Sequence, residues 1–256
     1  MSLSLFDLTG RTALITGSAR GIGMSLAEGL GAAGARIIVN SRGDDAVQAG
    51  VEHLRGAGID AIGAAFDVAD EAAVRAAFER FDADGIKIDI LVNNAGIQHR
   101  QPMLELALAD WQRVLDTNLT AAFLVGREAA RRMLQRGRGG KIINIGSLMS
   151  EAARATTAPY TVAKGGIKML SKAMAAEWAA HGIQANAIGP GYIHTDMNEK
   201  LVADPAFDAW VKASNPARRW GQPQELVGAA IFLASAASDY INGQIIYVDG
   251  GMLSVL

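Results

Sequence analysis

No cysteine occurs among the 256 residues of the chain. Disulfide bonds and thiolate metal sites are therefore excluded, and the composition suits a reducing compartment such as the cytoplasm. Histidine is scarce as well, and its four copies show no metal-ligand spacing: His53, His99, His181 and His194. Isolated histidines are by default surface residues, and we expect no catalytic metal.

Long apolar runs and a strong net charge are missing too. No stretch reaches the roughly 20 apolar residues that span a bilayer. The start of the chain, from Met1 to Asp7, lacks the basic and apolar regions of a signal peptide. The formal net charge of -2 indicates no surface for polyanions. We therefore expect a soluble, cytoplasmic protein that binds neither nucleic acid nor membranes.

Glycine, by contrast, is abundant, with 29 copies, and 50% of the residues are hydrophobic. Both features suit a compact fold with many tight turns. The first elements are a strand over 12–16, a glycine turn over 17–23, a helix over about 24–33 and a strand over 36–40. This order is typical of a βαβ unit.

Strands and helices continue to alternate along the chain. Further helices are predicted at 44–57, 70–82, 109–136, 160–180 and 223–235, and further strands at 60–66, 88–92, 141–145, 183–188 and 244–248. Apolar strands separated by amphipathic helices predict an α/β fold. We expect a single Rossmann-like domain over 1–256, a doubly wound parallel sheet flanked by helices on both faces. The segment 189–221 has weak periodicity and several prolines, and is predicted to be a substrate lid.

The glycine turn has the context of a dinucleotide-binding fingerprint, because it joins a strand to a helix. Gly17 permits the tight turn, and Gly21 lets the backbone approach a pyrophosphate. Gly23 allows the helix to pack closely on the strand, and the helix N-terminus supplies free N–H groups.

The tip of the second strand bears on the choice of cofactor. A carboxylate that reads a ribose 2′-hydroxyl is missing there, where Asn40, Ser41 and Arg42 stand. Arg42, together with Arg20 in the glycine turn, is suited to hold a 2′-phosphate through charge-assisted hydrogen bonds. These residues favour NADP(H), and NAD(H) stays an alternative.

Tyr160 and Lys164 are the candidates for proton chemistry. They are four residues apart in a helix whose start Pro159 favours, so both side chains lie on one face. A tyrosine with its ordinary pKa of about 10 is a poor proton donor or acceptor at neutral pH. A neighbouring ammonium lowers that pKa and makes the pair a usable acid/base.

The chain resembles the short-chain dehydrogenase/reductase family across essentially its whole length. The matching pieces occur in the family's order and spacing: Thr16 to Gly23, Asp67-Val68, Asn93 to Gly96, Asn118, Ser147, Tyr160 to Lys164 and Pro190-Gly191. The resemblance implies that Tyr160 is the general acid in reduction and the base in oxidation. It implies that Lys164 lowers the tyrosine pKa and holds the nicotinamide ribose. Ser147 would stabilise the substrate oxygen, and Asn118 would complete a proton relay through a water molecule.

The same resemblance implies the contacts of the cofactor. Asp67 and Val68 would touch adenine, and 94–96 would line the ribose. The whole implied set is Gly17, Ser18, Arg20, Gly21, Ile22, Gly23, Ser41, Arg42, Asp67, Val68, Asn94, Ala95, Gly96, Tyr160, Lys164, Pro190, Gly191, Ile193 and Thr195. The resemblance also implies a homotetramer built from the helices at 109–136 and 160–180 and from the C-terminal segment.

Within the family, the chain most resembles the gluconate 5-dehydrogenase branch, which interconverts D-gluconate and 5-keto-D-gluconate. The pieces concerned are Asn93 to Arg100, Ser150-Glu151, Arg154, Pro190 to Tyr192, Leu201 to Asp204, Trp210 and Ala217 to Gly221. The chain departs from this branch where His99-Arg100 replaces a usual arginine pair. It also has Gly146 and Met149 where a cysteine and a glutamine are usual.

A sugar-acid substrate gives several of these residues a role. Arg100 is suited to a gluconate carboxylate, although Arg100 and Arg154 have the alternative of being exposed loop arginines. Glu151 is suited to accept hydrogen bonds from sugar hydroxyls. Ser150 either touches substrate or caps its loop. With Ser147 and Tyr160, these residues form the predicted substrate site.

Two other functions stay open on the sequence. One is reduction of a different carbonyl, such as a 3-oxoacyl thioester or another sugar acid. The other is a cofactor-binding module without catalysis, which would be expected to lose Tyr160, Lys164 or Ser147. All three are present.

Overall fold

The computed structural model describes residues 4–255. Residues 1–3 and residue 256, which belong to the terminal segments considered above, lie outside the described residues. Within these residues, seven parallel strands form one sheet in the order β3-β2-β1-β4-β5-β6-β7. The strands are β1 (Thr12–Ile15), β2 (Arg36–Ser41), β3 (Ala61–Ala65), β4 (Ile90–Asn93), β5 (Gly140–Ile145), β6 (Ile183–Pro190) and β7 (Ile245–Val248). The order reverses beside β1, which creates a crevice at the carboxyl ends of β1 and β4.

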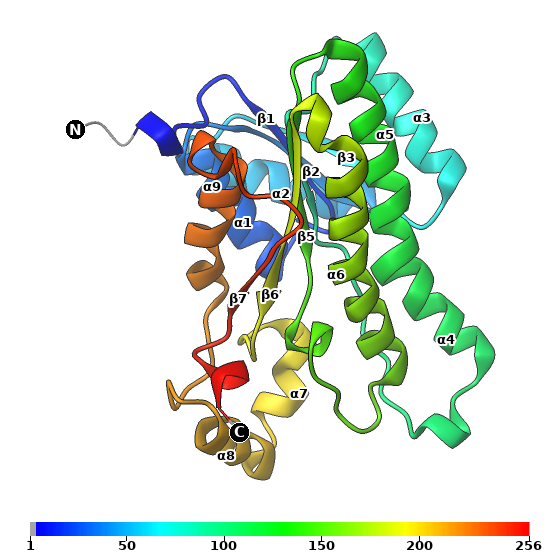
Figure 1. Ribbon diagram of the computed structural model, residues 1–256, viewed down its shortest axis with the longest axis vertical. Helices are drawn as coiled ribbons and strands as arrows, with labels where there is room; N and C mark the ends of the chain where they lie inside the picture. Colours follow the sequence, from blue (N-terminus) through cyan, green and yellow to red (C-terminus); the bar gives the residue numbers. More distant parts are fainter. Residues whose placement is uncertain (1–3, 256) are drawn as a thin grey trace.

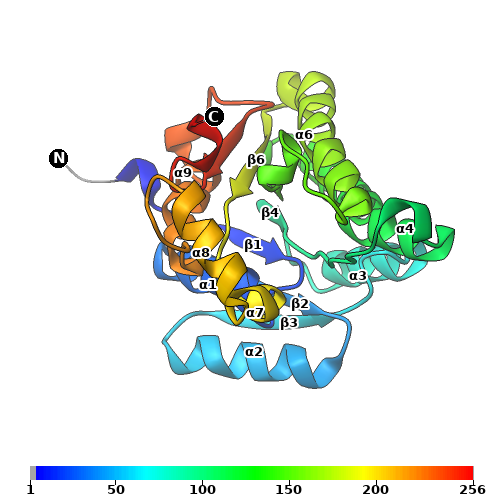
Figure 2. The ribbon, with the colours of Figure 1, turned by 90° about the horizontal axis from the view of Figure 1, so that it is seen from below.

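Helices cover both faces of the sheet (Figures 1 and 2). One face carries α1 (Gly21–Ala32), α2 (Asp44–Gly56) and α9 (Val227–Ala234). The other carries α3 (Glu71–Ala83), α4 (Leu108–Leu115), α5 (Ala121–Arg136) and α6 (Ala158–Trp178). The predicted doubly wound α/β fold is confirmed. The long helical region predicted at 109–136 is interrupted, because a π-helical turn over Asp116–Thr120 joins α4 to α5.

The strands are buried on both faces, which explains their continuous apolar sequences. Ala13 and Ile15 of β1 belong to one hydrophobic cluster, with Leu26 of α1. Leu14, between them, belongs to the second cluster, with Phe78 of α3. Successive side chains of a strand point to opposite faces, so a single strand contributes to both cores.

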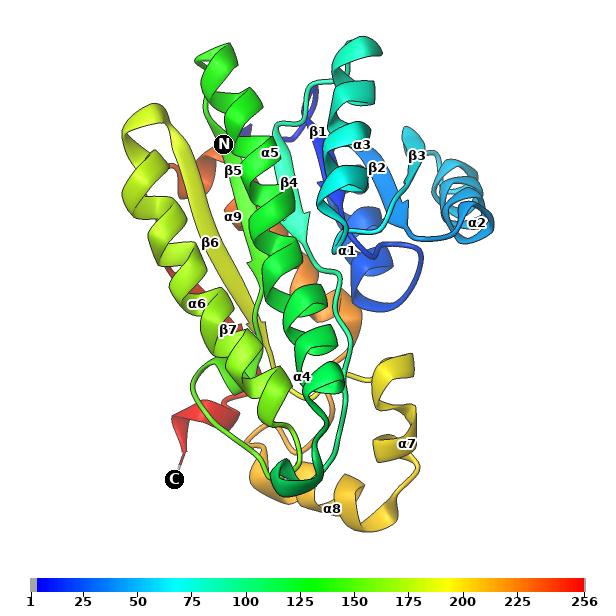
Figure 3. The ribbon, with the colours of Figure 1, turned by 90° about the vertical axis from the view of Figure 1, so that its right-hand side faces the viewer.

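The segment 189–221 contains more regular structure than its weak periodicity predicted. It includes the short helices α7 (Glu199–Val202) and α8 (Pro205–Ser214). The carboxylate of Asp204 caps α8 by accepting hydrogen bonds from the N–H groups of Ala206 and Phe207, at 3.0 and 3.3 Å. Both helices lie beyond the carboxyl ends of the strands (Figure 3). No helix in the part of the chain that the structure describes is both long and apolar enough to cross a membrane.

Candidate active site

The glycine turn between β1 and α1 depends on glycine at three positions. Gly17 has a φ of +63° and Gly21 a φ of +57°, in the left-handed region that favours glycine. A Cβ atom at Gly23 would lie 2.5 Å from the side-chain nitrogen of Asn94. The turn stands beside the N-terminus of α1, whose free N–H groups favour an anion.

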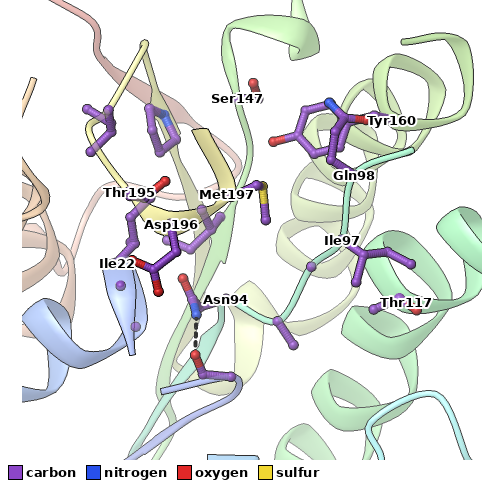
Figure 4. A pocket seen from close by; sticks show the side chains of 18 of the residues that line it. Ile22, Asn94, Ile97, Gln98, Thr117, Ser147, Tyr160, Thr195, Asp196 and Met197 are labelled. Atoms are coloured by element: carbon purple, nitrogen blue, oxygen red, sulfur yellow. Dashed lines mark hydrogen bonds between the residues drawn. The ribbon is translucent and has the colours of Figure 1, made fainter. Parts of the chain in front are cut away.

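Neighbouring side chains hold this turn in shape. The side-chain amide of Asn94 donates to the carbonyl oxygens of Thr16 and Gly17, at 2.9 and 3.1 Å. Figure 4 draws one of these two bonds. The oxygen of the Asn40 side chain accepts from the N–H of Gly17 at 3.3 Å.

The structure corrects the prediction for Ser18. Its hydroxyl is buried, donates to the carbonyl of Ile15 at 2.7 Å and accepts from the N–H of Asn40 at 3.1 Å. Its own N–H donates to the carbonyl of Asn40. With its polar groups engaged inside the turn, Ser18 shapes the turn rather than contacting a cofactor.

A cleft of about 940 Å³ opens from this turn along the carboxyl ends of the strands. It brings together most of the predicted site residues: Gly17, Arg20, Gly21, Ile22, Gly23, Ser41, Arg42, Asp67, Val68, Asn94, Ala95, Gly96, Arg100, Ser147, Arg154, Tyr160, Lys164, Pro190, Gly191, Ile193 and Thr195. Ser18, Asn118, Ser150 and Glu151 lie outside its lining.

Ser147 and Tyr160 meet at one end of the cleft. Ser147 follows β5 and caps the turn Leu148–Ser150, where its hydroxyl accepts from the N–H of Met149 at 3.1 Å. Tyr160 projects from the first turn of α6. Figure 4 shows both side chains on the same side of the pocket, across from Thr195.

The surroundings of Tyr160 differ from the sequence-based prediction. Burial raises the pKa of Tyr160, while the nearby hydroxyl of Ser147 and the positive charge of Arg100 oppose this rise. The expected lowering by Lys164 does not occur, because burial outweighs the neighbouring charges. The opposing charge comes from Arg100 instead.

Lys164 lies deep beside the tyrosine ring. Its Nζ atom is 5.5 Å from the centroid of the Tyr160 ring and donates to the carbonyl of Ile145 at 2.6 Å. Burial lowers the pKa of Lys164 to about 8. A charged ammonium therefore coexists with its neutral form in mildly alkaline solution.

Asn118 lies in the π-helical turn between α4 and α5, and its side chain forms two hydrogen bonds with the backbone of Ile97. The side-chain oxygen accepts from the N–H of Ile97 at 2.7 Å, and the side-chain nitrogen donates to the carbonyl of Ile97 at 2.8 Å. The buried amide thus fixes the loop that follows β4, next to Gly96 on the cleft wall.

The structure settles the choice left open for Ser150. Its hydroxyl donates to the carbonyl of Lys164 at 2.8 Å and accepts from the N–H of Ser147 at 3.3 Å. Ser150 is buried and ties the loop after β5 to α6, so it is a cap rather than a substrate contact.

Glu151 is not placed to bind sugar hydroxyls, which corrects a second prediction. Its carboxylate accepts hydrogen bonds from the ammonium of Lys168 and, at 3.0 Å, from the hydroxyl of Tyr247. The bond with Lys168 is the main reason why the pKa of Glu151 is lowered. These partners hold the carboxylate between α6 and β7, outside the cleft.

Two arginines stand near Tyr160 at the cleft's substrate end. Arg100 donates to the side-chain oxygen of Asn198 at 3.5 Å. Burial lowers the pKa of Arg100, and the positive charge of Arg154 adds to this effect. Within residues 4–255, neither guanidinium forms a salt bridge with a carboxylate. This end of the cleft is therefore suited to an anion.

Tyr192 lines the same end and was missed as a site residue. Burial raises the pKa of Tyr192, and the nearby positive charge of Arg154 opposes this rise. Its position in the sequence could have predicted this role. Tyr192 directly follows Pro190-Gly191, and ligands bind beyond the carboxyl ends of parallel strands.

The departures at Gly146 and Met149 have different structural contexts. A Cβ atom at Gly146 would lie 2.9 Å from the Cδ1 atom of Ile245, so a larger residue there requires the Ile245 side chain of β7 to shift. Met149 lines the cleft, as do Met197 and Leu201. The cleft lining therefore combines apolar side chains with the two cations Arg100 and Arg154.

The opposite end of the cleft carries the residues predicted to bind adenosine. Ser41 and Arg42 follow β2, and Arg20 stands in the glycine turn. The Nη1 atom of Arg20 lies 4.0 Å from a carboxylate oxygen of Asp196, in the segment 189–221. The cations at this end fit a nucleotide with a 2′-phosphate.

No group of three or more His, Cys, Asp or Glu side chains that could hold a metal is present among the described residues.

Comparisons with known proteins agree with this site. A family model described as "Enoyl-(Acyl carrier protein) reductase" matches residues 17–253. The chain is 48% identical to the gluconate 5-dehydrogenase of Gluconobacter oxydans, over 97% of this chain and 96% of that protein. It is 49% identical to the 5-keto-D-gluconate 5-reductase of Escherichia coli (strain K12), over 97% of this chain and 98% of that protein.

A solved structure extends the likeness to three dimensions. The gluconate 5-dehydrogenase from Burkholderia cenocepacia, crystallised in complex with NADP and tartrate, has a TM-score of 0.97 and 52% sequence identity. The match covers 100% of both chains. The chain belongs to the short-chain dehydrogenase/reductase family.

Proposed function

We propose that this protein is an NADP(H)-dependent oxidoreductase that interconverts D-gluconate and 5-keto-D-gluconate. The observation that carries the proposal is a single cleft lined by the glycine turn, Ser147, Tyr160 and Lys164. The names of its relatives, gluconate 5-dehydrogenase and 5-keto-D-gluconate 5-reductase, support the substrate.

The cofactor is NADP(H) in this proposal, as in the complex of the Burkholderia relative. The glycine turn and the N-terminus of α1 would hold the pyrophosphate. Arg20 and Arg42 would hold the 2′-phosphate, and Asp67 and Val68 would contact adenine. When bound, the nicotinamide supplies the hydride for reduction or accepts it in oxidation.

The proton chemistry belongs to Tyr160 and Ser147. In reduction, both hydroxyls donate hydrogen bonds to the carbonyl oxygen, and Tyr160 transfers its proton as that oxygen becomes a hydroxyl. The raised pKa of Tyr160 keeps it protonated at neutral pH, which favours reduction. In oxidation, Tyr160 takes the proton back, so this direction gains from alkaline conditions.

Lys164 and Asn118 complete the proposed proton path. Lys164 would hold the nicotinamide ribose and supply positive charge beside Tyr160. Asn118 would hold the end of a relay that returns a proton to the tyrosine. Their positions next to the cleft support these roles.

The substrate carboxylate would bind to Arg100 and Arg154. Both arginines line the cleft near Tyr160, and within residues 4–255 neither forms a salt bridge. The segment 189–221 would act as a lid, since it contributes Ile193 and Thr195 to the same cleft. The homotetramer and the cytoplasmic location stay predictions. Exposed apolar side chains on α5 and α6, such as Phe123 and Met169, support the tetramer.

A panel of carbonyl substrates tests the proposal. The purified protein is incubated with 5-keto-D-gluconate, a different sugar keto acid, a 3-oxoacyl thioester and a neutral ketohexose, each with NADPH and with NADH. We expect oxidation of NADPH with 5-keto-D-gluconate, and slower reaction with NADH. Turnover of another ketone without turnover of 5-keto-D-gluconate would contradict the proposed substrate. The proposed class of reaction, reduction of a ketone by NADPH, would still stand. No turnover on any member would favour a module without catalysis.

A further inference from the structure

The loop that carries Arg154, between the turn Leu148–Ser150 and α6, has a firmly held backbone. The hydroxyl of Thr157 donates to the carbonyl of Arg154 at 2.8 Å. Thr156 has a φ of 67°, a left-handed conformation that a β-branched residue adopts only under constraint. Its carbonyl accepts from the N–H of Gln101 at 2.9 Å. Because the backbone is fixed, the position of the guanidinium depends on what its side chain contacts.

Those contacts come from the segment 189–221. The guanidinium carbon of Arg154 lies 4.7 Å from the centroid of the Phe207 ring, and its positive charge is close enough to Tyr192 to oppose the rise in the pKa of that tyrosine. The Nη1 atom of Arg154 is buried and has no hydrogen-bond partner among the described residues. Arg154 therefore rests on aromatic groups that steady its position without neutralising its charge.

Phe207 belongs to α8 and is not part of the cleft lining, whereas Arg154 and Tyr192 are. It is locked into an aromatic cluster with Tyr192 and Trp210, at centroid distances of 5.6 and 5.3 Å. The indole N–H of Trp220 adds a bond to Asp208 of α8 at 2.9 Å. The placement of Arg154 in the cleft is thus connected to the docking of α8 below the sheet (Figures 1 and 3).

We propose that Phe207 is a positioning residue that makes the cleft selective for carboxylate-bearing substrates, by holding the guanidinium of Arg154 towards the bound acid. The inference rests on the proposed function, in which Arg154 receives the substrate carboxylate. Arg100 and Arg154 repel each other across the cleft. A carboxylate between them removes that repulsion, and the Phe207 ring keeps Arg154 from swinging away before the acid arrives. Docking of α8 and recognition of the acid group are therefore coupled.

A double-variant cycle tests the coupling. Phe207→Leu keeps an apolar side chain but removes the ring, and Arg154→Met removes the charge. We expect Phe207→Leu to raise KM for 5-keto-D-gluconate about tenfold and to change kcat less than about threefold. The dissociation constant of NADPH, read by fluorescence, stays unchanged. In a chain that already carries Arg154→Met, we expect Phe207→Leu to raise KM for 5-keto-D-gluconate little further. The guanidinium that the ring would position is then absent.

Phe6→Leu is the control for the loss of a phenylalanine ring. Phe6 is partly exposed in the turn Ser4–Phe6 and lies outside the cleft lining. We expect this variant to keep the wild-type KM, and thermal unfolding of every variant checks that it folds.

Three results would overturn the inference. A rise in KM from Phe207→Leu that is equally large with and without Arg154 would show that the ring acts by another route. A rise in KM for a neutral ketohexose equal to that for the keto acid would remove the link to the carboxylate. An unchanged KM in Phe207→Leu would remove the positioning role. In each case, wild-type turnover of 5-keto-D-gluconate would leave the proposed function standing. Absence of that turnover would remove the proposed substrate and this inference together.

Discussion

At the scale of single residues, burial governs the proton chemistry of the cleft. Tyr160 and Lys164 lie next to each other, and burial raises the pKa of the tyrosine but lowers that of the lysine to about 8. Both shifts favour the neutral form of the group, because a low dielectric destabilises charge. Spacing in the sequence predicted the pair, but the direction of the tyrosine shift required the packed structure.

The hydroxyl of Tyr160 is the atom on which turnover depends. We expect Tyr160→Phe to lower kcat for 5-keto-D-gluconate by about 10²- to 10⁴-fold, because the general acid is lost. The dissociation constant of NADPH, measured by fluorescence titration, should stay within about twofold, since the ring and its contacts are kept.

Tyr240→Phe is the control for that variant, because Tyr240 is fully exposed on the surface. It should retain wild-type kcat. Retention of most of the activity by Tyr160→Phe would contradict the assignment of the general acid.

At the scale of elements, close packing of α1 on α9 depends on a glycine that has no special backbone angle. A Cβ atom at Gly29 of α1 would lie 2.2 Å from a methyl carbon of Val227, the first residue of α9. Gly228, the next residue of α9, is exposed and has no atom within 4 Å of such a Cβ. The two glycines look alike in the sequence, but only one lies at an interface between helices.

The two alanine variants should therefore have opposite effects on stability. Gly29→Ala is expected to lower the free energy of unfolding by about 1–3 kcal/mol, because the added methyl overpacks the interface. Gly228→Ala should leave it unchanged or raise it by up to about 1 kcal/mol, because alanine loses less backbone entropy on folding. Urea denaturation measures both. Equal stabilities of the two variants would show that α9 shifts freely away from α1.

At the scale of the whole molecule, Lys164 links stability to pH. The pKa of Lys164 is about 8 in the folded chain, against an ordinary value of 10.5. Between these values the unfolded chain binds more protons, so this group makes the free energy of unfolding increase as pH rises from 8 to 10.5. The contribution amounts to about 3 kcal/mol over the full range.

We expect the free energy of unfolding of the wild type, minus that of Lys164→Met, to rise between pH 7.5 and 10. Urea denaturation across this range, without added cofactor, gives the difference at each pH. Lys200→Met, at an exposed position, should show a flat difference. If the difference in free energy of unfolding between the wild type and Lys164→Met stays constant or falls as pH rises, the lowered pKa of Lys164 is contradicted.

The sequence by itself determined the parallel α/β fold, the glycine turn and the grouping of Ser147, Tyr160 and Lys164 in one cleft. The fold and the turn follow from periodicity and from the rule that the carboxyl ends of parallel strands meet at one edge of the sheet. The grouping of the three side chains follows from motifs that resemble those of the short-chain dehydrogenase/reductase family. The sequence did not determine which polar side chains face that edge. Ser18 and Glu151 follow or flank site motifs, yet hydrogen bonds with distant residues turn both away from the cleft.

Only the tertiary structure decided the contact between Arg154 and Phe207. The two residues belong to segments far apart in the chain, and the ring reaches the guanidinium only because α8 docks below the sheet. Their meeting depends on packing in three dimensions, and so does the balance of burial and charge that sets the pKa of Tyr160. Local sequence patterns predict neither the contact nor the pKa shift. The low dielectric around Tyr160 and the contact between distant segments exist only in the folded chain.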